Sequence, residues 1–305
     1  MKRHAPEIDA VRAIARKYLR DVLTVERVPK GASTFVYRAT TGAGTFYLRF
    51  LPEQASFAAE VLAHEMMLAA GLKVPRIIGF EHREAETGLS LMVAEEIPGV
   101  SLEEDCPQDT VPEILLAAGR QLALLHTIPV EGFGWIDRSS YTVLKGEKPG
   151  FDAYFVEYLE HDLDVLRLYA FTKEQKMQIS SLMETAGQLL RVENAVLVHG
   201  DFDVSHIFHT AGCYTGIIDF GEIRGNNRVF DLATFVGFYR DRRLYSYLLE
   251  GYRDVAPLTP GDLYAVELMA LFILLRFLGK KAHTPSGDHW YCQVQAHLRD
   301  MSTVK

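Results

Sequence analysis

The sequence predicts an α+β fold of two lobes, a small antiparallel sheet with one helix followed by a larger, mainly helical part. Between residues 25 and 97, short apolar or alternating runs are separated by turn residues, which is typical of strands. Pro98-Gly99 interrupts the last of these runs, and most segments with helical spacing come after it. We therefore expect an N-terminal lobe of residues 1–97 and a C-terminal lobe of residues 98–305.

The first lobe is expected to contain strands, their turns and a single helix. Strands are predicted where apolar and polar residues alternate or where apolar residues run between turns: two within 25–39, then 45–50, 76–80 and 89–97. Residues 57–70 are rich in Ala, Leu, Met and Glu and are followed by Gly71, which predicts a helix and its end.

The second lobe is expected to be mainly helical. Segments with helical spacing or long apolar runs predict helices at 111–127, 173–190 and 259–278. Thr172 and Gln175 form a capping-box pattern at the start of the second helix. Thr259, followed by a proline, is the expected N-cap of the third helix. This third helix is almost wholly apolar, so we expect it to lie inside the lobe.

Composition excludes several classes of protein. The formal net charge of −8 argues against a nucleic-acid binder, which needs a basic face. The cysteines Cys106, Cys213 and Cys292 lie far apart, so neither a disulfide framework nor a zinc site is indicated. The most apolar stretch, 266–278, is too short for a membrane helix and contains Arg276. We expect a cytoplasmic protein with no membrane partner, either a monomer or a homodimer.

Two short predicted strands, 195–198 and 214–218, lead into the most informative residues of the chain. Asp201, within a His-Gly-Asp sequence, follows the first strand, and Asp219, just before Phe-Gly, follows the second. We expect these strands to bring both carboxylates to one place, as a hairpin beside a cleft would.

The spacing of these carboxylates is similar to that in protein kinases. There, the loop H-R-D-x-x-x-x-N supplies an Asp that orients the attacking hydroxyl and accepts its proton, and the Asp of a later D-F-G binds metal. Asp201 and Asp219 match the two aspartates, while His206 stands in the position of the Asn. We expect Asp201 to be the catalytic base, and the alternative is a turn aspartate that caps local amides.

Asp219 and His206 are expected to hold a metal ion. A carboxylate suits Mg²⁺, with a turn-capping Asp as the alternative. Imidazole suits softer metals better, so the alternative for His206 is a structural histidine. His199 is expected to support the catalytic loop through hydrogen bonds, and Asp231 is expected to hold the backbone of that loop.

Several further segments carry a resemblance to a known family: residues 31–38, 47–50, 64–65, 74–77, 96–102, 124–126 and 230–233. With the two aspartate motifs, they make nearly the whole chain resemble the aminoglycoside phosphotransferase-like small-molecule kinases, which have a protein-kinase-like two-lobed fold. Macrolide kinases and some aminoglycoside kinases are similar in having histidine at the position of His206. The resemblance implies Mg²⁺ and either ATP or GTP as cofactors.

The resemblance also implies the residues that bind the nucleotide, namely Gly31, Ser33, Arg49, Glu65, Glu96 and Ile97. Gly31 and Ser33 would bring backbone amides to the phosphates, but no G-x-G-x-x-G is present, and a simple turn is the alternative. Arg49 replaces the usual lysine of the third strand, and we expect Glu65 to hold it. The alternative is a solvent-facing strand arginine. The last two residues fall at the expected lobe junction, where backbone groups would meet a purine.

The function that this resemblance implies is phosphoryl transfer to a hydroxyl group of a small molecule, with an aminoglycoside or macrolide antibiotic as the first candidate. One alternative is a metabolic kinase of a sugar or amino alcohol, and another is a nucleotide-binding pseudokinase, because the positions of Arg49 and His206 are altered. The acidic stretch 152–164 would face ammonium groups of an acceptor or form a solvated helix face. Trp290 and Tyr291 would stack on an acceptor or anchor packing.

Overall fold

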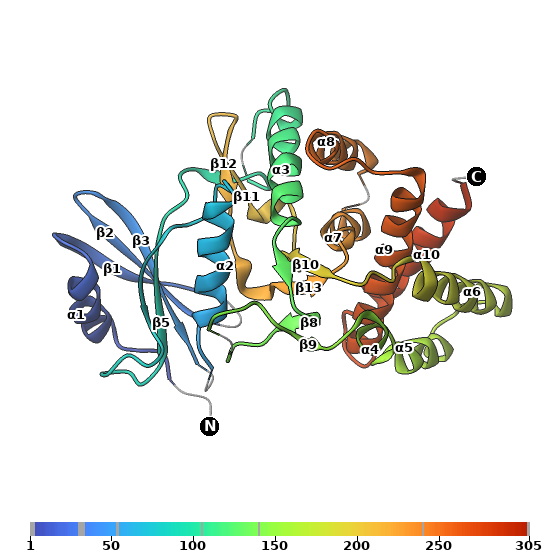
Figure 1. Cartoon of the computed structure of the whole chain (residues 1–305), viewed down its shortest axis with the longest axis horizontal. Coiled ribbons are helices and arrows are strands. Elements are labelled where there is room, and N and C mark those ends of the chain that lie inside the picture. The colour runs from blue at the N-terminus through green and yellow to red at the C-terminus, as the bar shows by residue number, and fades with distance from the viewer. Residues whose placement is uncertain are drawn as a thin grey trace.

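A computed structural model describes residues 4–29, 34–52, 55–104, 106–139, 141–239 and 241–303. Gly31 and Ser33, the expected phosphate-loop residues, lie outside the described residues. The chain forms a lobe built on an antiparallel sheet and a larger helical lobe beside it (Figure 1), which confirms the predicted α+β class.

The first lobe is a five-stranded antiparallel sheet in the order β1-β2-β3-β5-β4. Its strands are β1 (Val22–Val28), β2 (Phe35–Thr41), β3 (Gly44–Leu51), β4 (Ile77–Glu81) and β5 (Ser90–Glu95). Helix α2 (Ala58–Ala69) connects β3 to β4 and lies between the sheet and the second lobe (Figure 1). The expected strands and helix of this lobe are therefore present, with ends that differ by a few residues.

Helix α1 (Ile8–Tyr18) was not predicted from the sequence. It buries Val11, Ile14 and Ala15 at helical spacing, and these side chains join the core formed by the sheet residues Leu48 and Phe50. The i, i+3, i+4 pattern is present in the sequence, but the many charged residues around it obscured the short apolar stripe.

The second lobe contains eight α-helices within the described residues. They are α3 (Val111–Leu125), α4 (Phe151–Val156), α5 (Leu159–Val165), α6 (Lys173–Leu189), α7 (Phe230–Phe238), α8 (Arg242–Arg253), α9 (Pro260–Lys281) and α10 (Gly287–Thr303). The capping box of Thr172 and Gln175 is formed, and Thr259 caps α9 with Asp262, so both predicted helix starts are confirmed.

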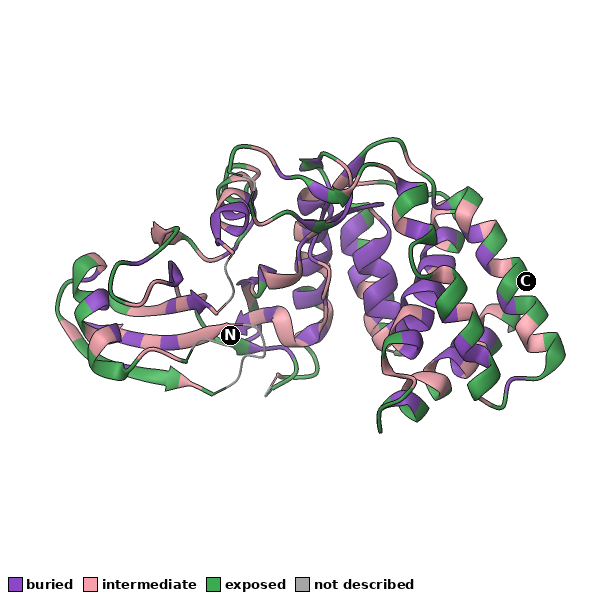
Figure 2. Cartoon of the chain, turned by 90° about the horizontal axis from the view of Figure 1, so that it is seen from below, coloured by how far each residue is buried: buried purple, intermediate pink, exposed green. Residues whose placement is uncertain are grey.

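Helix α9 is the central element of the helical lobe. It is buried along most of its length and contacts α5, α6, α7 and α10. Figure 2 shows the buried residues, in purple, concentrated on the inner helices of this lobe, while its outer helices turn exposed faces to solvent. No helix in the described ranges is long and apolar enough to cross a membrane.

Short strands lie between the helices and form two small sheets. One sheet has the order β7-β10-β13-β8-β9, and the other has the order β12-β11-β6. The strands are β6 (Val100–Ser101), β7 (Pro129–Val130), β8 (Phe133–Ile136), β9 (Gly146–Lys148), β10 (Ala195–Val198), β11 (Ile207–Thr210), β12 (Cys213–Ile217) and β13 (Arg224–Asn226).

The expected pairing of the two motif strands is wrong. β10 pairs with β7 and β13, whereas β12 pairs with β11, which precedes it directly along the chain. Ala211 and Gly212 form the tight turn of this hairpin, both with positive φ. The sequence analysis overlooked β11, and a neighbouring strand joined by a tight turn is the nearer partner for β12.

Pro98 and Gly99 lie between β5 and β6, at the proposed boundary between the lobes. Gly99 has φ +106°, and a Cβ there would lie 2.0 Å from the carbonyl oxygen of His209 on β11. Strand β6 then pairs with β11. This close approach supports our proposal that the lobes divide between residues 97 and 98.

Candidate active site

The loop that carries Asp201 is fixed to helix α7 by a buried aspartate. Asp231, in the first turn of α7, accepts hydrogen bonds from the backbone N–H groups of His199 (2.8 Å) and Gly200 (2.9 Å). Gly200 has φ +87°, and a Cβ there would lie 2.0 Å from the carbonyl oxygen of Glu222. Only glycine fits this position, and the two hydrogen bonds to Asp231 hold the backbone of the loop that leads to Asp201.

Asp231 is fully buried and remains a carboxylate because it has several donors. His126 lies 3.0 Å from it through Nε2, and Nδ1 of the same ring lies 2.9 Å from the hydroxyl of Tyr252. Burial by itself would raise the pKa of Asp231, but the hydrogen bond and charge of His126, with the amide of Gly200, outweigh burial and lower it.

His199 connects the backbone of the two aspartate motifs. Its Nε2 donates to the carbonyl oxygen of Ile218 (2.9 Å), the residue before Asp219, and its Nδ1 accepts from the N–H of Asp201 (3.3 Å). One donating and one accepting nitrogen define a neutral imidazole. Burial lowers the pKa of His199, with a further contribution from His206, which favours the same neutral form.

His206 points its second ring nitrogen at Asp219. Nδ1 lies 2.8 Å from the carbonyl oxygen of Asp201, and because a carbonyl can only accept, Nδ1 must carry the proton. In the neutral form of this ring, Nε2 carries the lone pair, and this atom lies 3.8 Å from Oδ2 of Asp219. A histidine that ligates a metal commonly donates its other N–H in this way.

Asp219 stands in a conformation that non-glycine residues adopt rarely. Its φ and ψ are both 63°, in the left-handed region, and its side chain is 57% exposed. The following residue, Phe220, is buried between the rings of His64 and His199 at centroid distances of 5.2 and 4.8 Å. Packing of Phe220 therefore holds the backbone that presents the Asp219 carboxylate.

Arg49 on β3 is paired with Glu60, not with Glu65 as the sequence analysis expected. The Arg49 guanidinium contacts the Glu60 carboxylate through Nη1, and its Nη2 lies 3.8 Å from Oδ1 of Asp219. Glu60 is buried in the first turn of α2, whereas Glu65 is exposed.

The helical phase of α2 explains this correction. The side chain of Glu65 is five residues further along the helix and so points about 140° away from Glu60. The buried residues Ala59, Ala63 and Met67 mark the inner face, and Glu60 adjoins it. This apolar spacing is visible in the sequence and would have identified Glu60.

His64, also on the inner face of α2, is a buried neutral residue. Its Nδ1 lies 2.9 Å from the carbonyl oxygen of Pro75. Burial, together with the neighbouring charge of Arg49, lowers the pKa of His64 to about 3. His64 therefore adds no positive charge to the site beside Arg49.

At the lobe junction, the side chains of Glu96 and Ile97 have partners within the protein. Glu96 accepts from the hydroxyl of Tyr47 (3.0 Å) and lies 3.6 Å from Nε of Arg38. The side chain of Ile97 packs over Gly216 on β12, where a Cβ would lie 3.1 Å from it. Any contact of these two residues with a purine would therefore involve their backbone groups.

Asp219 and His206 together suit a metal ion that arrives with a nucleotide. Within the ranges that the structure describes, no group of three or more His, Cys, Asp or Glu side chains could hold a metal ion. Mg²⁺ usually takes one or two carboxylates and fills its remaining positions with water and substrate phosphates. The carboxylate of Asp219, with the Nε2 lone pair of His206 beside it, fits that kind of binding.

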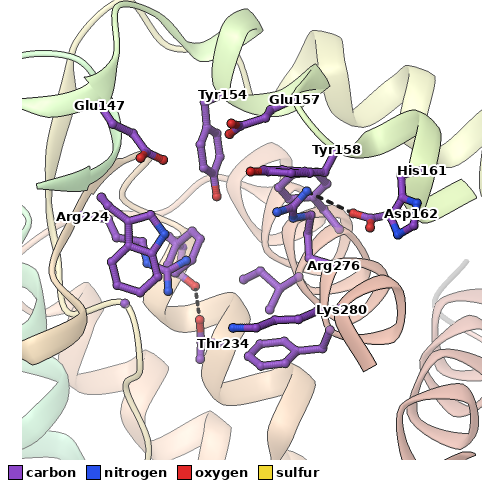
Figure 3. A pocket seen from close by; sticks show the side chains of 16 residues that line it. Glu147, Tyr154, Glu157, Tyr158, His161, Asp162, Arg224, Thr234, Arg276 and Lys280 are labelled. Atoms are coloured by element: carbon purple, nitrogen blue, oxygen red, sulfur yellow. Dashed lines mark hydrogen bonds and ion pairs between the residues drawn. The ribbon is translucent and has the colours of Figure 1, made fainter. Parts of the chain in front are cut away.

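A cavity of about 750 Å³ opens beside the loop that carries Asp201, and Gly200 is part of its wall. Figure 3 shows the side chains that line this cavity. The cavity is enclosed by strands β8 and β9, helices α4 and α5, and the inner faces of α7 and α9. Aromatic side chains form much of the wall: Trp135, Tyr154, Tyr158, Phe230, Phe272 and Phe277.

Arg224 lines this cavity and lies beside the loop that carries Asp201, since its Nε would be 3.2 Å from a Cβ at Gly200. Its guanidinium lies 3.9 Å from the ring centroid of Trp135 and 3.3 Å from the carboxylate of Glu222. Burial raises the pKa of Glu222, and although Arg224 opposes this shift, the nearby charge of Asp201 adds to it. Glu222 therefore lies near the charges of both Arg224 and Asp201.

The sequence analysis identified only some of the residues that line the cavity. Within the acidic stretch 152–164, Glu157 and Asp162 line it, whereas Asp152 and Asp164 form exposed ion pairs with arginines. Trp290 stacks on Phe277 and Tyr291 stacks on Tyr169, so the aromatic pair has the packing role that was the alternative. The cavity residues that sequence reasoning missed include Trp135, Glu147, Tyr158, Arg224, Arg276 and Lys280.

Several solved structures share this fold. A thermostable mutant of aminoglycoside phosphotransferase APH(4)-Ia, in ternary complex with AMP-PNP and hygromycin B, is 14% identical with a TM-score of 0.70, over 96% of this chain and 99% of that one. A protein assigned as a fructosamine-3-kinase from Thermobifida fusca is 19% identical with a TM-score of 0.66, over 96% and 100%. Macrolide 2′-phosphotransferase MphH from Brachybacterium faecium is 16% identical with a TM-score of 0.61, over 94% and 97%.

Comparison of the sequence with protein-family models shows the family to which the chain belongs. A comparison with curated proteins finds no significant match. The model of the APH phosphotransferase enzyme family, however, matches residues 24–263, which include the sheet, both aspartate motifs and the start of α9. The chain therefore belongs to the APH phosphotransferase enzyme family and is a small-molecule kinase.

Proposed function

We propose that this enzyme transfers the γ-phosphate of ATP or GTP to a hydroxyl group of a small molecule bound in the cavity beside Gly200. The observation that carries the proposal is the bonding of His199, which joins the backbone of Asp201 to the residue before Asp219. One carboxylate for the hydroxyl and one for the metal-bound phosphates are thereby held in one site. The AMP-PNP complex of the similar APH(4)-Ia structure supports nucleotide binding.

In the proposed reaction, Asp201 acts on the acceptor. Its carboxylate orients the hydroxyl and accepts its proton while the hydroxyl oxygen bonds to the γ-phosphorus. The bond between that phosphorus and the bridging oxygen breaks, and a nucleoside diphosphate leaves. The fixed conformation of the loop at Gly200 keeps Asp201 in place for each turnover.

Asp219, His206 and Arg49 act on the nucleotide in this proposal. Asp219 and His206 would hold Mg²⁺, directly or through water, and Mg²⁺ supplies neutralisation of the phosphate charge. Arg49 would donate to phosphate oxygens, and its pairing with Glu60 fixes the direction of the guanidinium. Arg49 lies 3.8 Å from Asp219, so the two groups face the same space.

Two acceptor classes are supported by different observations. The similarity to aminoglycoside and macrolide phosphotransferase structures supports an antibiotic as acceptor. The cavity itself favours the metabolic alternative with an uncharged sugar as acceptor, because an amino alcohol would carry a positive charge. Its acidic residues Glu157 and Asp162 are already paired with cations of the protein, so they are poorly placed to receive a polycation.

An acceptor screen tests the proposed function. Purified enzyme is incubated with Mg²⁺, ATP or GTP, and a panel of aminoglycosides, macrolides, sugars and amino alcohols, and each product is examined for the added mass of a phosphate group. Transfer to any hydroxyl supports the proposal, and the acceptor identifies the class. Nucleotide binding without transfer to any member would favour the pseudokinase alternative.

The ion pair between Glu60 and Arg49 leads to a prediction about how the enzyme uses its nucleotide. Glu60→Gln should lower kcat/KM for the nucleotide by about tenfold to a hundredfold, because Arg49 loses the carboxylate that directs it. Glu65→Gln is the matched control on the same helix and should change kcat/KM by less than about twofold, because Glu65 is exposed. Equal effects of the two substitutions in steady-state kinetics would contradict the assignment of Glu60.

A further inference from the structure

One face of helix α9 forms the floor of the cavity and presents two cations to it. The residues of α9 that line the cavity are Phe272, Ile273, Arg276, Phe277 and Lys280. Arg276 and Lys280 are four residues apart, so they lie on the same side of the helix. Like charges at this spacing repel each other, and an anion between them would remove the repulsion.

Arg276 lies in the cavity wall between a buried carboxylate and an aromatic ring. Its Nη1 lies 3.3 Å from Oδ2 of Asp162, and its guanidinium lies 4.0 Å from the ring centroid of Tyr158. The Asp162 side chain is only 3% exposed and touches α9 at Gly279, where a Cβ would lie 2.0 Å from Oδ1. A guanidinium has five N–H donors, and this ion pair involves one of its nitrogens, so further donors remain for a ligand.

Lys280 supplies a charge with no partner of its own. It forms no ion pair with any residue in the described part of the chain, and Figure 3 shows its side chain directed into the cavity below Arg276. The positive charge of Lys280 acts to lower the pKa of Glu222, against the larger effect of burial. Glu222 is itself paired with Arg224 at 3.3 Å.

The acidic residues around the cavity are largely neutralised by the protein. Glu157 lies 2.6 Å from Nζ of Lys148, and Asp162 is paired with Arg276. Glu147 has no ion pair among the described residues, but it lies across the cavity from Lys280 (Figure 3). The position best prepared for a charged ligand is therefore on the α9 side, and it is prepared for an anion.

We propose that the acceptor is an alcohol with an anionic group, a carboxylate or a phosphate ester, which binds between Arg276 and Lys280. This inference rests on the proposed function, because it assigns the charge of the molecule whose hydroxyl faces Asp201. Arg276 and Lys280 bind the anionic group, and the aromatic wall contacts the body of the molecule. A polycationic aminoglycoside is, on this view, a poor acceptor.

Ligands that share a phenyl ring and carry groups of different charge test the inference by binding, without any need for transfer. Dissociation constants of phenylacetate, phenyl phosphate, 2-phenylethanol and 2-phenylethylamine are measured by titration calorimetry at low salt. At least one of the two anions should bind about tenfold more tightly than the neutral alcohol, and the amine should bind no better than the alcohol. If neither anion exceeds the alcohol, the inference is wrong.

Variants of two adjacent lysines test which residue causes the preference for anionic ligands. Lys280→Met should reduce the preference for the anion by about tenfold, because a charged donor is lost. Lys281→Met removes the same charge from the next position of α9, which does not line the cavity, and should retain the preference. A preference that survives Lys280→Met, or that is lost equally in Lys281→Met, would overturn the assignment.

The same purified proteins show whether a negative result counts against this inference or against the proposed function. Binding of AMP-PNP should be equal in wild type and Lys280→Met, because Lys280 belongs to the acceptor cavity. An anion preference in an enzyme that phosphorylates no hydroxyl would count against the proposed function. Efficient phosphorylation of a neutral or cationic acceptor, with no anion preference in binding, would leave that function standing and refute the anionic acceptor.

Discussion

Asp201→Asn is expected to lower kcat for phosphoryl transfer by about 10²–10⁴, the range attributed to general-base assistance. Asparagine keeps the size and hydrogen-bonding capacity of the side chain but cannot accept the hydroxyl proton at neutral pH. Nucleotide affinity should be nearly unchanged, because in this account Asp201 acts on the acceptor and Asp219 on the phosphates. Single-turnover measurement of transfer, with separate measurement of nucleotide binding, tests both expectations.

Asp203→Asn is the matched control in the same loop. Asp203 accepts hydrogen bonds from the N–H of Ser205 (2.7 Å) and from its hydroxyl, and the amide oxygen of asparagine can accept in the same way. This variant should retain most activity. If Asp203→Asn proved as damaging as Asp201→Asn, or if Asp201→Asn kept full activity, Asp201 would not be the base.

Asp231→Ala is expected to have the largest effect on stability, a loss of about 3–5 kcal/mol in the free energy of unfolding. The substitution leaves two backbone donors of the catalytic loop and the ring of His126 without their buried acceptor. Chemical denaturation followed by circular dichroism measures the change. Activity should fall as well, because the loop at Gly200 loses its attachment to α7.

A surface aspartate is the control for this prediction. Asp164 pairs with Arg167 on the surface, with both side chains more than 60% exposed. Exposed pairs of this kind contribute little, so Asp164→Ala should change the free energy of unfolding by less than about 1 kcal/mol. Equal losses for the two variants would contradict the role given to the Asp231 network.

The pH dependence of the Asp231 contribution follows from the direction of its pKa shift. The folded-state pKa lies below the ordinary value of 3.8, so the native state stabilises the carboxylate. That contribution is fully present above pH 3.8 and is lost as the pH falls through the lower, folded-state pKa. The difference in stability between wild type and Asp231→Ala should therefore be constant at neutral pH and shrink only in strong acid.

Local patterns in the sequence predicted much of the fold because the same residues produce the elements. The Thr172 and Thr259 caps form as expected, since a hydroxyl beside a free backbone N–H needs no distant partner. The alternation of apolar and polar residues in β3 likewise predicts a strand with one buried face. The pairing of β10 was wrong because strand partners depend on the path of the whole chain, and β7 and β13 come from distant segments.

The site was predictable to the extent that its residues lie in motifs. Asp201, His206 and Asp219 occur within one short region, and the structure brings them together. The exchange of Glu65 for Glu60 shows that a motif without its helical phase does not identify which carboxylate faces inward.

The cavity proposed to bind the acceptor was harder to predict from the sequence. Its walls come from β8, α5 and α9, which are far apart along the chain and meet only through packing. Arg276 was noticed as an interruption of an apolar run, but its role depends on the buried Asp162 beside it.

A crystal structure with AMP-PNP and Mn²⁺ in place of Mg²⁺ tests the central claim most directly, because anomalous scattering locates the metal. The account predicts a metal ion bound to Asp219, with His206 bound directly or through one water, and the Asp201 carboxylate facing the γ-phosphate across the mouth of the cavity. A metal ion remote from Asp219, or an Asp201 carboxylate turned away from the γ-phosphate, would contradict it.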